Sequence, residues 1–111
     1  MCGIAGILGF GKVKGFDASR SLSSMLNAIK HRGPDDRGEI NISGDNGLEL
    51  WLGHQRLSII DLSDLGHQPM SNSEKTLWVC SNGEIYNFRE LRKQLYSKFT
   101  FLTDWVLPIK Q

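Results

Sequence analysis

The chain has 111 residues, enough for one small domain at most. Hydrophobic residues make up 40% and charged residues 23%, which is typical of a globular core and not of a disordered segment. The formal net charge of +1 is spread along the chain, so no basic stripe indicates nucleic-acid or membrane-surface binding, and no apolar run is long enough to span a bilayer.

The first element begins beside a cysteine, in the stretch "MCGIAGILGFG". Residues 4–8 predict a short buried strand, which glycines then end. The apolar run is short, broken by glycine and preceded by no basic segment, so it is not a signal peptide. Glycine stands at position 3 and not at position 2, which excludes N-myristoylation. The position of Cys2 therefore indicates either chemistry or coincidence.

A helix is predicted next, because apolar residues recur at the i, i+3, i+4 and i+7 spacing of one buried face. These residues are Leu22, Met25, Leu26 and Ile29. Gly33 and Pro34 stop the helix. Residues 39–43 and 48–52 then predict two paired strands, since residues 44–47 have the composition of a hairpin turn.

The second half of the chain predicts further strands and one more helix. Residues 57–60 are another apolar run, residues 62–73 have loop composition, and residues 76–80 predict a strand that ends in the Asn82-Gly83 turn. Asn87 is predicted to cap a helix with Glu90 as its capping-box partner. This order of elements favours an α+β fold in which sheet packs against sheet with helices outside.

The cysteine count says little about cross-linking. Cys80 lies among apolar neighbours and is interpreted as a buried strand thiol. Two cysteines without a zinc-site spacing predict neither a disulfide scaffold nor a metal site, and they fit a reducing cytoplasm best.

Three polar stretches stand out: "HRGPDDRG" at 31–38, "GHQRLSIID" at 53–61 and "NGEIYN" at 82–87. Each alone is explained by a helix stop, a strand start or a turn. With Cys2 they resemble, from residue 1 to about residue 95, the N-terminal glutaminase domain of glutamine-dependent asparagine synthetases. This is a class II glutamine amidotransferase with an N-terminal nucleophile. The "GPDD" and "EIYN" residues distinguish this resemblance from other class II glutaminases.

The resemblance implies an Ntn-hydrolase-like four-layer αββα sandwich, of which the chain would hold the first part. Residues 1–104 would be a partial glutaminase domain and residues 105–111 a divergent tail. The C-terminal synthetase domain, which binds ATP, Mg and aspartate in the family, would be absent. No cofactor and no metal is therefore expected in this chain.

The resemblance also assigns the chemistry. Removal of Met1 would leave Cys2 with a free α-amine, so one residue would supply both nucleophile and base. Its thiolate would attack the side-chain carboxamide of L-glutamine. Asn82 and Gly83 would donate hydrogen bonds to the oxyanion. Because no histidine is needed as a base, His31, His54 and His67 are interpreted as structural.

Glutamine binding is assigned in the same way. Arg56 matches the arginine that holds the α-carboxylate, since a guanidinium suits a carboxylate. Glu84 matches an acidic residue near the amide, and Asp104, in "FTFLTD" at 99–104, would hold the α-ammonium. The expected substrate-binding set is Arg56, Leu57, Ser58, Ile59, Ile60, Asn82, Gly83, Glu84 and Asp104. His31, Arg32 and Asp35 would be supporting structure.

The resemblance predicts a cytoplasmic enzyme that acts on L-glutamine, with a synthetase domain normally in the same chain and no nucleic-acid or membrane partner. Two alternatives stay open: a glutaminase that feeds a different acceptor, and an inactive truncated remnant. The chain as it stands is expected to have little or no glutaminase activity and to aggregate or be partly ordered, because strand edges and inner sheet faces would be open to water.

Overall fold

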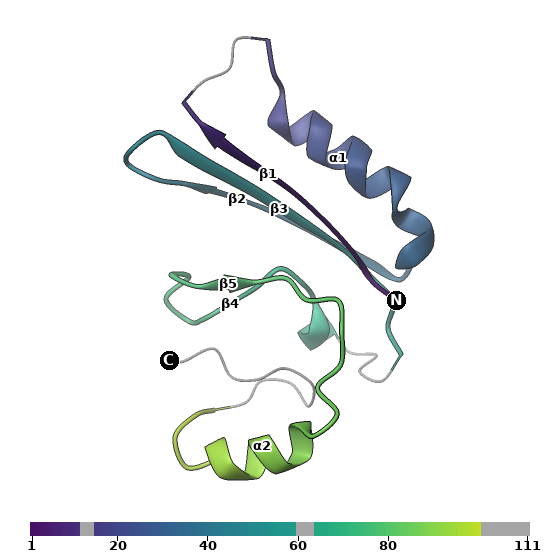
Figure 1. Cartoon of the computed structure of the whole chain (residues 1–111), viewed down its shortest axis with the longest axis vertical. Helices are drawn as coiled ribbons and strands as arrows, with labels where there is room; N and C mark the ends of the chain where they lie inside the picture. Colours follow the sequence, from purple (N-terminus) through teal and green to yellow (C-terminus); the bar gives the residue numbers. More distant parts are fainter. Residues whose placement is uncertain (12–14, 60–63, 101–111) are drawn as a thin grey trace.

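The computed structural model describes residues 1–11, 15–59 and 64–100. It is a small α+β structure with two antiparallel sheets (Figure 1). The elements are, in chain order, β1 (Gly3–Phe10), α1 (Ala18–Ala28), the 3₁₀ turn η1 (Lys30–Arg32), β2 (Asp36–Ser43), β3 (Leu48–Arg56), the 3₁₀ turn η2 (Asp64–Gly66), β4 (Met70–Ser71), β5 (Trp78–Val79) and α2 (Phe88–Leu95). None of the described helices is long and apolar enough to cross a membrane.

The larger sheet has the strand order β1-β3-β2. Strand β3 pairs antiparallel with both neighbours, so that Gln55 lies opposite Gly3 and Arg56 lies opposite Asp36. The predicted hairpin is confirmed, but its strands extend further from the turn than 39–43 and 48–52. Because β3 continues to Arg56, it carries the start of the "GHQRLSIID" stretch beside the first residues of β1.

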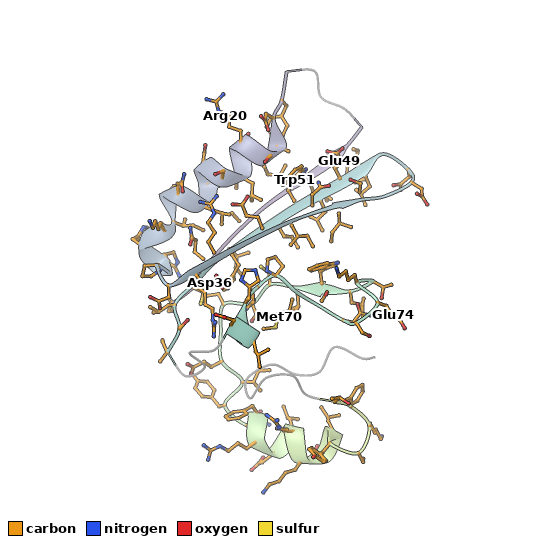
Figure 2. The ribbon with its side chains drawn as sticks, turned by 180° about the vertical axis from the view of Figure 1, so that it is seen from behind. Arg20, Asp36, Glu49, Trp51, Met70 and Glu74 are labelled. Atoms are coloured by element: carbon orange, nitrogen blue, oxygen red, sulfur yellow. The ribbon has the colours of Figure 1, made fainter. Side chains whose placement is uncertain are left out.

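Helix α1 covers one face of this sheet (Figure 1). Asp17 caps it by accepting a hydrogen bond from the Arg20 N–H at 3.0 Å. Its buried face is formed by Leu22 and Leu26, which are 0% exposed. They form the core with Ala5, and Ile7, Ile29 and Trp51 pack against it. In Figure 2, Trp51 lies between the helix and the sheet, whereas Met70 lies on the β4–β5 side.

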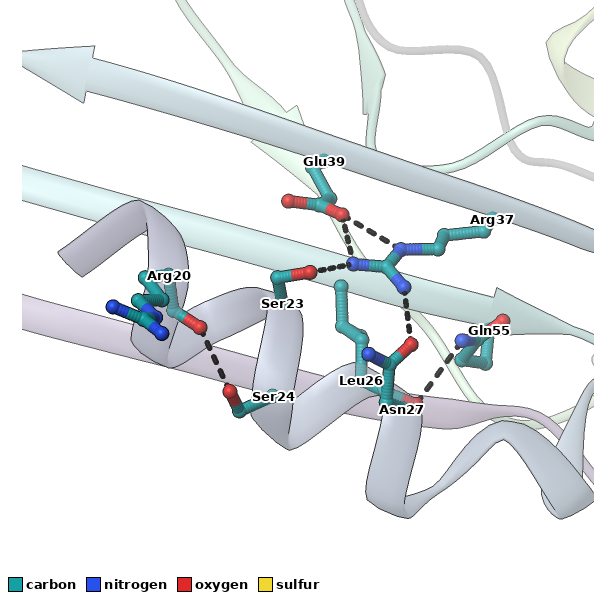
Figure 3. Close-up of polar contacts among 8 residues, drawn as sticks. All are labelled: Arg20, Ser23, Ser24, Leu26, Asn27, Arg37, Glu39 and Gln55. Atoms are coloured by element: carbon teal, nitrogen blue, oxygen red, sulfur yellow. Dashed lines mark hydrogen bonds and ion pairs between the residues drawn. The ribbon is translucent and has the colours of Figure 1, made fainter. Parts of the chain in front are cut away.

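The predicted buried face of the helix is wrong at one position, because Met25 is 41% exposed. Polar groups join the same helix to the sheet (Figure 3). Arg37 on β2 donates to the side chains of Asn27 and Ser23, each at 2.8 Å, and pairs with Glu39. The Gln55 amide of β3 donates to the Leu26 carbonyl at 3.1 Å.

The opposite face of the sheet is partly open. On β1, Ile4 is 43% exposed, Leu8 59% and Phe10 76%. The β4–β5 ribbon lies on this side, with α2 beyond it (Figure 1). The ribbon is attached near the carboxyl end of β3, where the Cys80 thiol lies 3.9 Å from the Gly53 carbonyl. Helix α2 has no buried residue.

Several short elements differ from their predictions. Residues 57–59 form no strand, and Ile59 is 65% exposed. The expected loop at 62–73 contains η2 and β4, and the strand expected at 76–80 is reduced to Trp78–Val79. The strand is shortened because the N–H groups of Thr76 and Leu77 donate to the Asn72 side chain, at 2.8 and 2.9 Å. Ile60 and Asp104, and the tail at 105–111, lie outside the described residues.

Two predictions about single side chains are also corrected. Asn87 is the N-cap of α2, but its side chain makes no capping hydrogen bond, and its backbone carbonyl accepts from Glu90 and Leu91 instead. Cys80 follows β5 and is half-buried, so it is not a buried strand thiol.

Candidate active site

A pocket of about 300 Å³ opens beside the first residues of the chain. The described residues that line it are Cys2, Gly3, Ile4, Ile29, Arg32 and Asn82. They come from the start of β1, the end of α1 with η1, and the turn after the β4–β5 ribbon. Residues from three distant parts of the sequence therefore surround the half-buried thiol of Cys2.

Backbone groups of the "GHQRLSIID" stretch hold the Cys2 thiol. The Leu57 N–H donates to the Cys2 Sγ at 3.4 Å, and the Leu57 carbonyl lies 3.9 Å from the same sulfur. The register of β1 and β3 explains this contact, because Gly3 pairs with Gln55 and so brings Leu57 beside Cys2. The "GHQRLSIID" stretch thus contacts the thiol through its backbone.

The "HRGPDDRG" stretch contacts the backbone of Cys2 and the backbone around the end of β3. The Arg32 Nε donates to the Cys2 carbonyl at 3.1 Å. The Asp35 carboxylate accepts from the Ser58 N–H at 2.8 Å, and the Asp35 N–H donates to the Arg56 carbonyl at 3.0 Å. The "HRGPDDRG" stretch therefore joins Cys2 to the loop after β3.

The turn at residues 82–84 contributes one lining residue to the pocket, as η1 does. Asn82 lines the pocket, whereas Gly83 and Glu84 are exposed and are not among its lining residues. The preceding residue, Ser81, is bound to two other segments: its carbonyl lies 3.2 Å from the His54 Nε2, and its N–H donates to the Gln68 Oε1 at 2.7 Å.

Residues 1–105 match the family model described as "Glutamine amidotransferase domain". The chain belongs to this family. Among similar proteins are the "Putative asparagine synthetase [glutamine-hydrolyzing] 2" of Methanocaldococcus jannaschii, 42% identical over 124 aligned positions and 99% of this chain, and the "Asparagine synthetase [glutamine-hydrolyzing] 1" of Bacillus subtilis, 40% identical over 94% of this chain. The "Amidase chyE" of Penicillium rubens is 44% identical over 73% of this chain.

This amidotransferase domain chain is much shorter than these relatives. It spans 23% of the Methanocaldococcus protein, 16% of the Bacillus protein and 11% of the Penicillium protein. The sequence similarity to glutamine-hydrolysing asparagine synthetases therefore covers only a small part of those relatives.

Arg56 is placed differently from the lining residues of the amidotransferase pocket. Its side chain is only 8% exposed, and its guanidinium lies against Gly66 of η2, where a Cβ would collide with it. Arg56 is not among the residues that line the pocket. Of the other expected binding residues, Leu57 contacts Cys2, Ser58 contacts Asp35, and Ile59 is exposed.

None of the three histidines lines the pocket. His31 is exposed, and the His67 Nδ1 lies 2.8 Å from the Asp36 carboxylate. His54 is 0% exposed, and this burial lowers its pKa below 6.5. Within the described residues, no cluster of His, Cys, Asp and Glu could hold a metal ion.

Two contacts at this site were not predicted from the sequence. Arg32 was expected only as supporting structure, yet it lines the pocket and binds the backbone of Cys2. The bond between His54 and Ser81 was not predicted either. The sequence signal for the Arg32 contact was the position of an arginine directly after the helix that packs on β1. The bond between His54 and Ser81 depends on how the β4–β5 ribbon packs against β3, and no local sequence pattern predicts that packing.

Proposed function

We propose that this domain hydrolyses the side-chain amide of L-glutamine with Cys2 as nucleophile, and that the chain by itself turns over at most slowly because its sheet edges are open to water. The observation that supports this most strongly is that the Cys2 thiol and Asn82 line the same pocket in a chain of the glutamine amidotransferase family. A pocket with one sulfur nucleophile and an amide donor suits acyl transfer, in which charge develops on an oxygen.

The proposed reaction starts after Met1 has been removed. The α-amine of Cys2 takes the thiol proton, and the sulfur attacks the carboxamide carbon of glutamine. The oxyanion accepts hydrogen bonds from the Asn82 side chain and the Gly83 N–H. Collapse of the tetrahedral intermediate breaks the C–N bond, and ammonia leaves with the proton. Water then hydrolyses the thioester, releasing glutamate and restoring the thiol.

The remaining substrate contacts are proposals of the same kind. Arg56 is assigned to the α-carboxylate, Glu84 to the amide and Asp104 to the α-ammonium. The backbone from Leu57 to Ile60 would form a wall of the binding site. Arg56 reaches the substrate in this proposal only if its guanidinium turns from Gly66 toward Cys2.

The complete fold is proposed to be the four-layer αββα sandwich of the Ntn hydrolases, of which this chain supplies the first part. The order of α1, the three-stranded sheet, the β4–β5 ribbon and α2 in Figure 1 supports it. In the whole protein, the ammonia would pass to a synthetase domain that uses ATP and aspartate to make asparagine. The alternative is another acceptor, which the similarity to an amidase keeps open.

The test is a single-turnover experiment on the chain with Met1 removed. A diazoketone analogue of glutamine should alkylate Cys2, as located by mass spectrometry, and glutamine should protect the residue. Release of glutamate and ammonia is measured in parallel. Cys2→Ser should abolish both labelling and hydrolysis.

Cys80→Ser is the matched control. Burial raises the pKa of the Cys80 thiol to about 11, so this thiol stays protonated at neutral pH and is a poor nucleophile. Its replacement should leave labelling and hydrolysis unchanged. A wild-type chain that is neither labelled at Cys2 nor able to release glutamate would contradict the proposed function.

A further inference from the structure

We propose that His54 and Gln68 are positioning residues that together hold the Asn82–Gly83 turn by binding both backbone groups of Ser81. The catalytic meaning of this clamp rests on the proposed function, in which that turn binds the oxyanion. The two hydrogen bonds that form this clamp are part of the structure and do not depend on the proposed function.

The turn has little packing of its own to fix it. Strand β5 ends at Val79, so Ser81 lies beyond the ribbon's ladder. Asn82, Gly83 and Glu84 are exposed, and apart from its chain neighbours no described atom lies within 4 Å of a Cβ built on Gly83. The two bonds on Ser81, at 3.2 Å to His54 and 2.7 Å to Gln68, are therefore the attachment nearest to the proposed oxyanion hole.

His54 is well suited to anchor this turn. It lies on the central strand β3, opposite Ile4 on one side and Gly38 on the other, and its side chain is 0% exposed. Its Nδ1 is buried with no hydrogen-bond partner among the described residues, whereas its Nε2 faces the Ser81 carbonyl. The neutral tautomer with its proton on Nε2 satisfies this carbonyl and leaves only a lone pair unpaired.

Gln68 lies against β2, an edge strand of the same three-stranded sheet. A Cβ on Gly38 of β2 would collide with the Gln68 carbonyl, so the glycine allows this segment to touch the strand. The neighbouring His67 contacts the Asp36 carboxylate at 2.8 Å and attaches the segment a second time. Ser81 is thus bound by His54 of the sheet and by Gln68 of a segment that lies against the same sheet.

The consequence for catalysis follows from the distance sensitivity of oxyanion stabilisation. Donors act only when they point at the place where charge develops, and a misplacement of about 1 Å costs roughly 100-fold in rate. Loss of either anchor should therefore lower kcat much more than it weakens glutamine binding. A residue that only stabilised the fold would not produce this split.

The test compares variants that lose a bond with variants that keep it. His54→Leu removes the donor, whereas His54→Gln places an amide N–H where Nε2 was. Gln68→Leu removes the acceptor, whereas Gln68→Glu retains an oxygen. Gln94→Leu, on the exposed surface of α2, is the matched control. Each variant is assayed for kcat, KM and the rate of Cys2 alkylation by iodoacetamide, which needs no oxyanion hole.

We expect both leucine variants to lower kcat by roughly 10- to 100-fold, with a much smaller rise in KM and an alkylation rate within about twofold of wild type. The Gln and Glu variants should recover most of kcat. Equal losses in the leucine variants and their conservative partners would overturn the proposal. If His54→Leu fails to fold, the half-buried Gln68 supplies the decisive pair.

A second measurement tests whether His54 and Gln68 hold the turn, and it does not depend on activity. If the wild-type chain releases no glutamate, that result contradicts the proposed function and leaves this test unaffected. Backbone ¹⁵N relaxation reports the order parameters of Asn82 and Gly83. They should fall toward the flexible range, below about 0.6, in the two leucine variants, and stay at the wild-type value in His54→Gln, Gln68→Glu and Gln94→Leu. Unchanged order parameters in both leucine variants would overturn the clamp.

Discussion

Arg56 lies at the carboxyl end of β3 with a guanidinium that is almost fully buried against Gly66. Such a group can serve the fold, the substrate or both, and Arg56→Lys separates these roles. Lysine keeps the charge but loses the planar fork that matches a carboxylate. If Arg56 binds the glutamine α-carboxylate, KM should rise roughly 10- to 100-fold, as expected for a lost charged hydrogen bond, with a much smaller change in kcat.

The melting temperature of Arg56→Lys must be measured with the kinetics, because a buried arginine also contributes to packing. Arg20→Lys, on the exposed side of α1, is the control for a conservative change at the surface. A lowered melting temperature with an unchanged KM would show that Arg56 serves the fold and does not bind substrate.

His54 gives the chain a pH-dependent stability. Burial lowers its pKa in the folded state below the ordinary value of 6.5 and outweighs the hydrogen bond to Ser81 and the charge of Asp36, which raise it; Arg56 and His67 lower it further. The unfolded chain therefore binds the proton first as the pH falls. The contribution of His54 is complete above about pH 6.5 and is lost as the pH falls through the lower, folded pKa.

The measurement is the melting temperature between pH 8 and pH 5 for the wild type and His54→Gln. The wild type should lose more stability than the variant over this range, because glutamine does not titrate. Since the two proteins differ only at residue 54, the difference between the two curves isolates His54. Parallel curves would contradict the assignment.

At the scale of single residues, the structure brings residues of the quoted motifs together, but their contacts could be predicted only in part. Cys2 and Asn82 line one pocket, and the Leu57 N–H of the "GHQRLSIID" stretch donates to the Cys2 thiol. The burial of Arg56 and the clamp on Ser81 could not be read from the sequence. Both depend on how loops without periodicity fold back on the sheet.

Among the elements, α1 contributes most of the described core. Leu22 and Leu26 are both 0% exposed and face the sheet through Gly53, where a Cβ would collide with Leu26. Leu26→Ala should destabilise the chain by about 2–5 kcal/mol, since it removes buried methyl groups and leaves a cavity. Urea unfolding followed by circular dichroism measures the change.

Met25→Ala is the matched control, because it truncates an apolar side chain on the same helix. Met25 is 41% exposed, so its truncation should cost much less than that of Leu26. Similar losses of unfolding free energy in the two variants would mean that Leu26 is not on the buried face of α1 and Met25 on the exposed one.

The elements that the sequence predicted well are those fixed by local patterns. The periodicity of residues 22–29 predicted α1, and the polar turn at 44–47 predicted the β2–β3 hairpin. The failures are short segments. Residues 57–59 and 76–80 are apolar enough for strands, but a strand needs a partner, and of these residues only Trp78 and Val79 find one, in β4. The missing cap at Asn87 shows the same dependence on surroundings.

For the whole molecule, the two faces of the three-stranded sheet differ in how well they are covered. Helix α1 covers one face, whereas on the other face Leu8 and Phe10 of the edge strand β1 are 59% and 76% exposed. An edge strand with exposed apolar side chains is a ready site for pairing with another copy. The chain should therefore self-associate through this face, with an apparent mass that rises with concentration.

The double variant Leu8→Lys/Phe10→Lys tests this expectation by light scattering coupled to size exclusion. Because both side chains already lie mostly in water, the change should alter folding stability by only about 0.5 kcal/mol per site, while charge at the edge prevents pairing. The variant should stay monomeric over a concentration range in which the wild type associates. Phe16→Lys, at an exposed apolar residue outside the sheet, should associate as the wild type does. A wild-type mass independent of concentration, or equal association in the double variant, would show that this open face does not drive assembly.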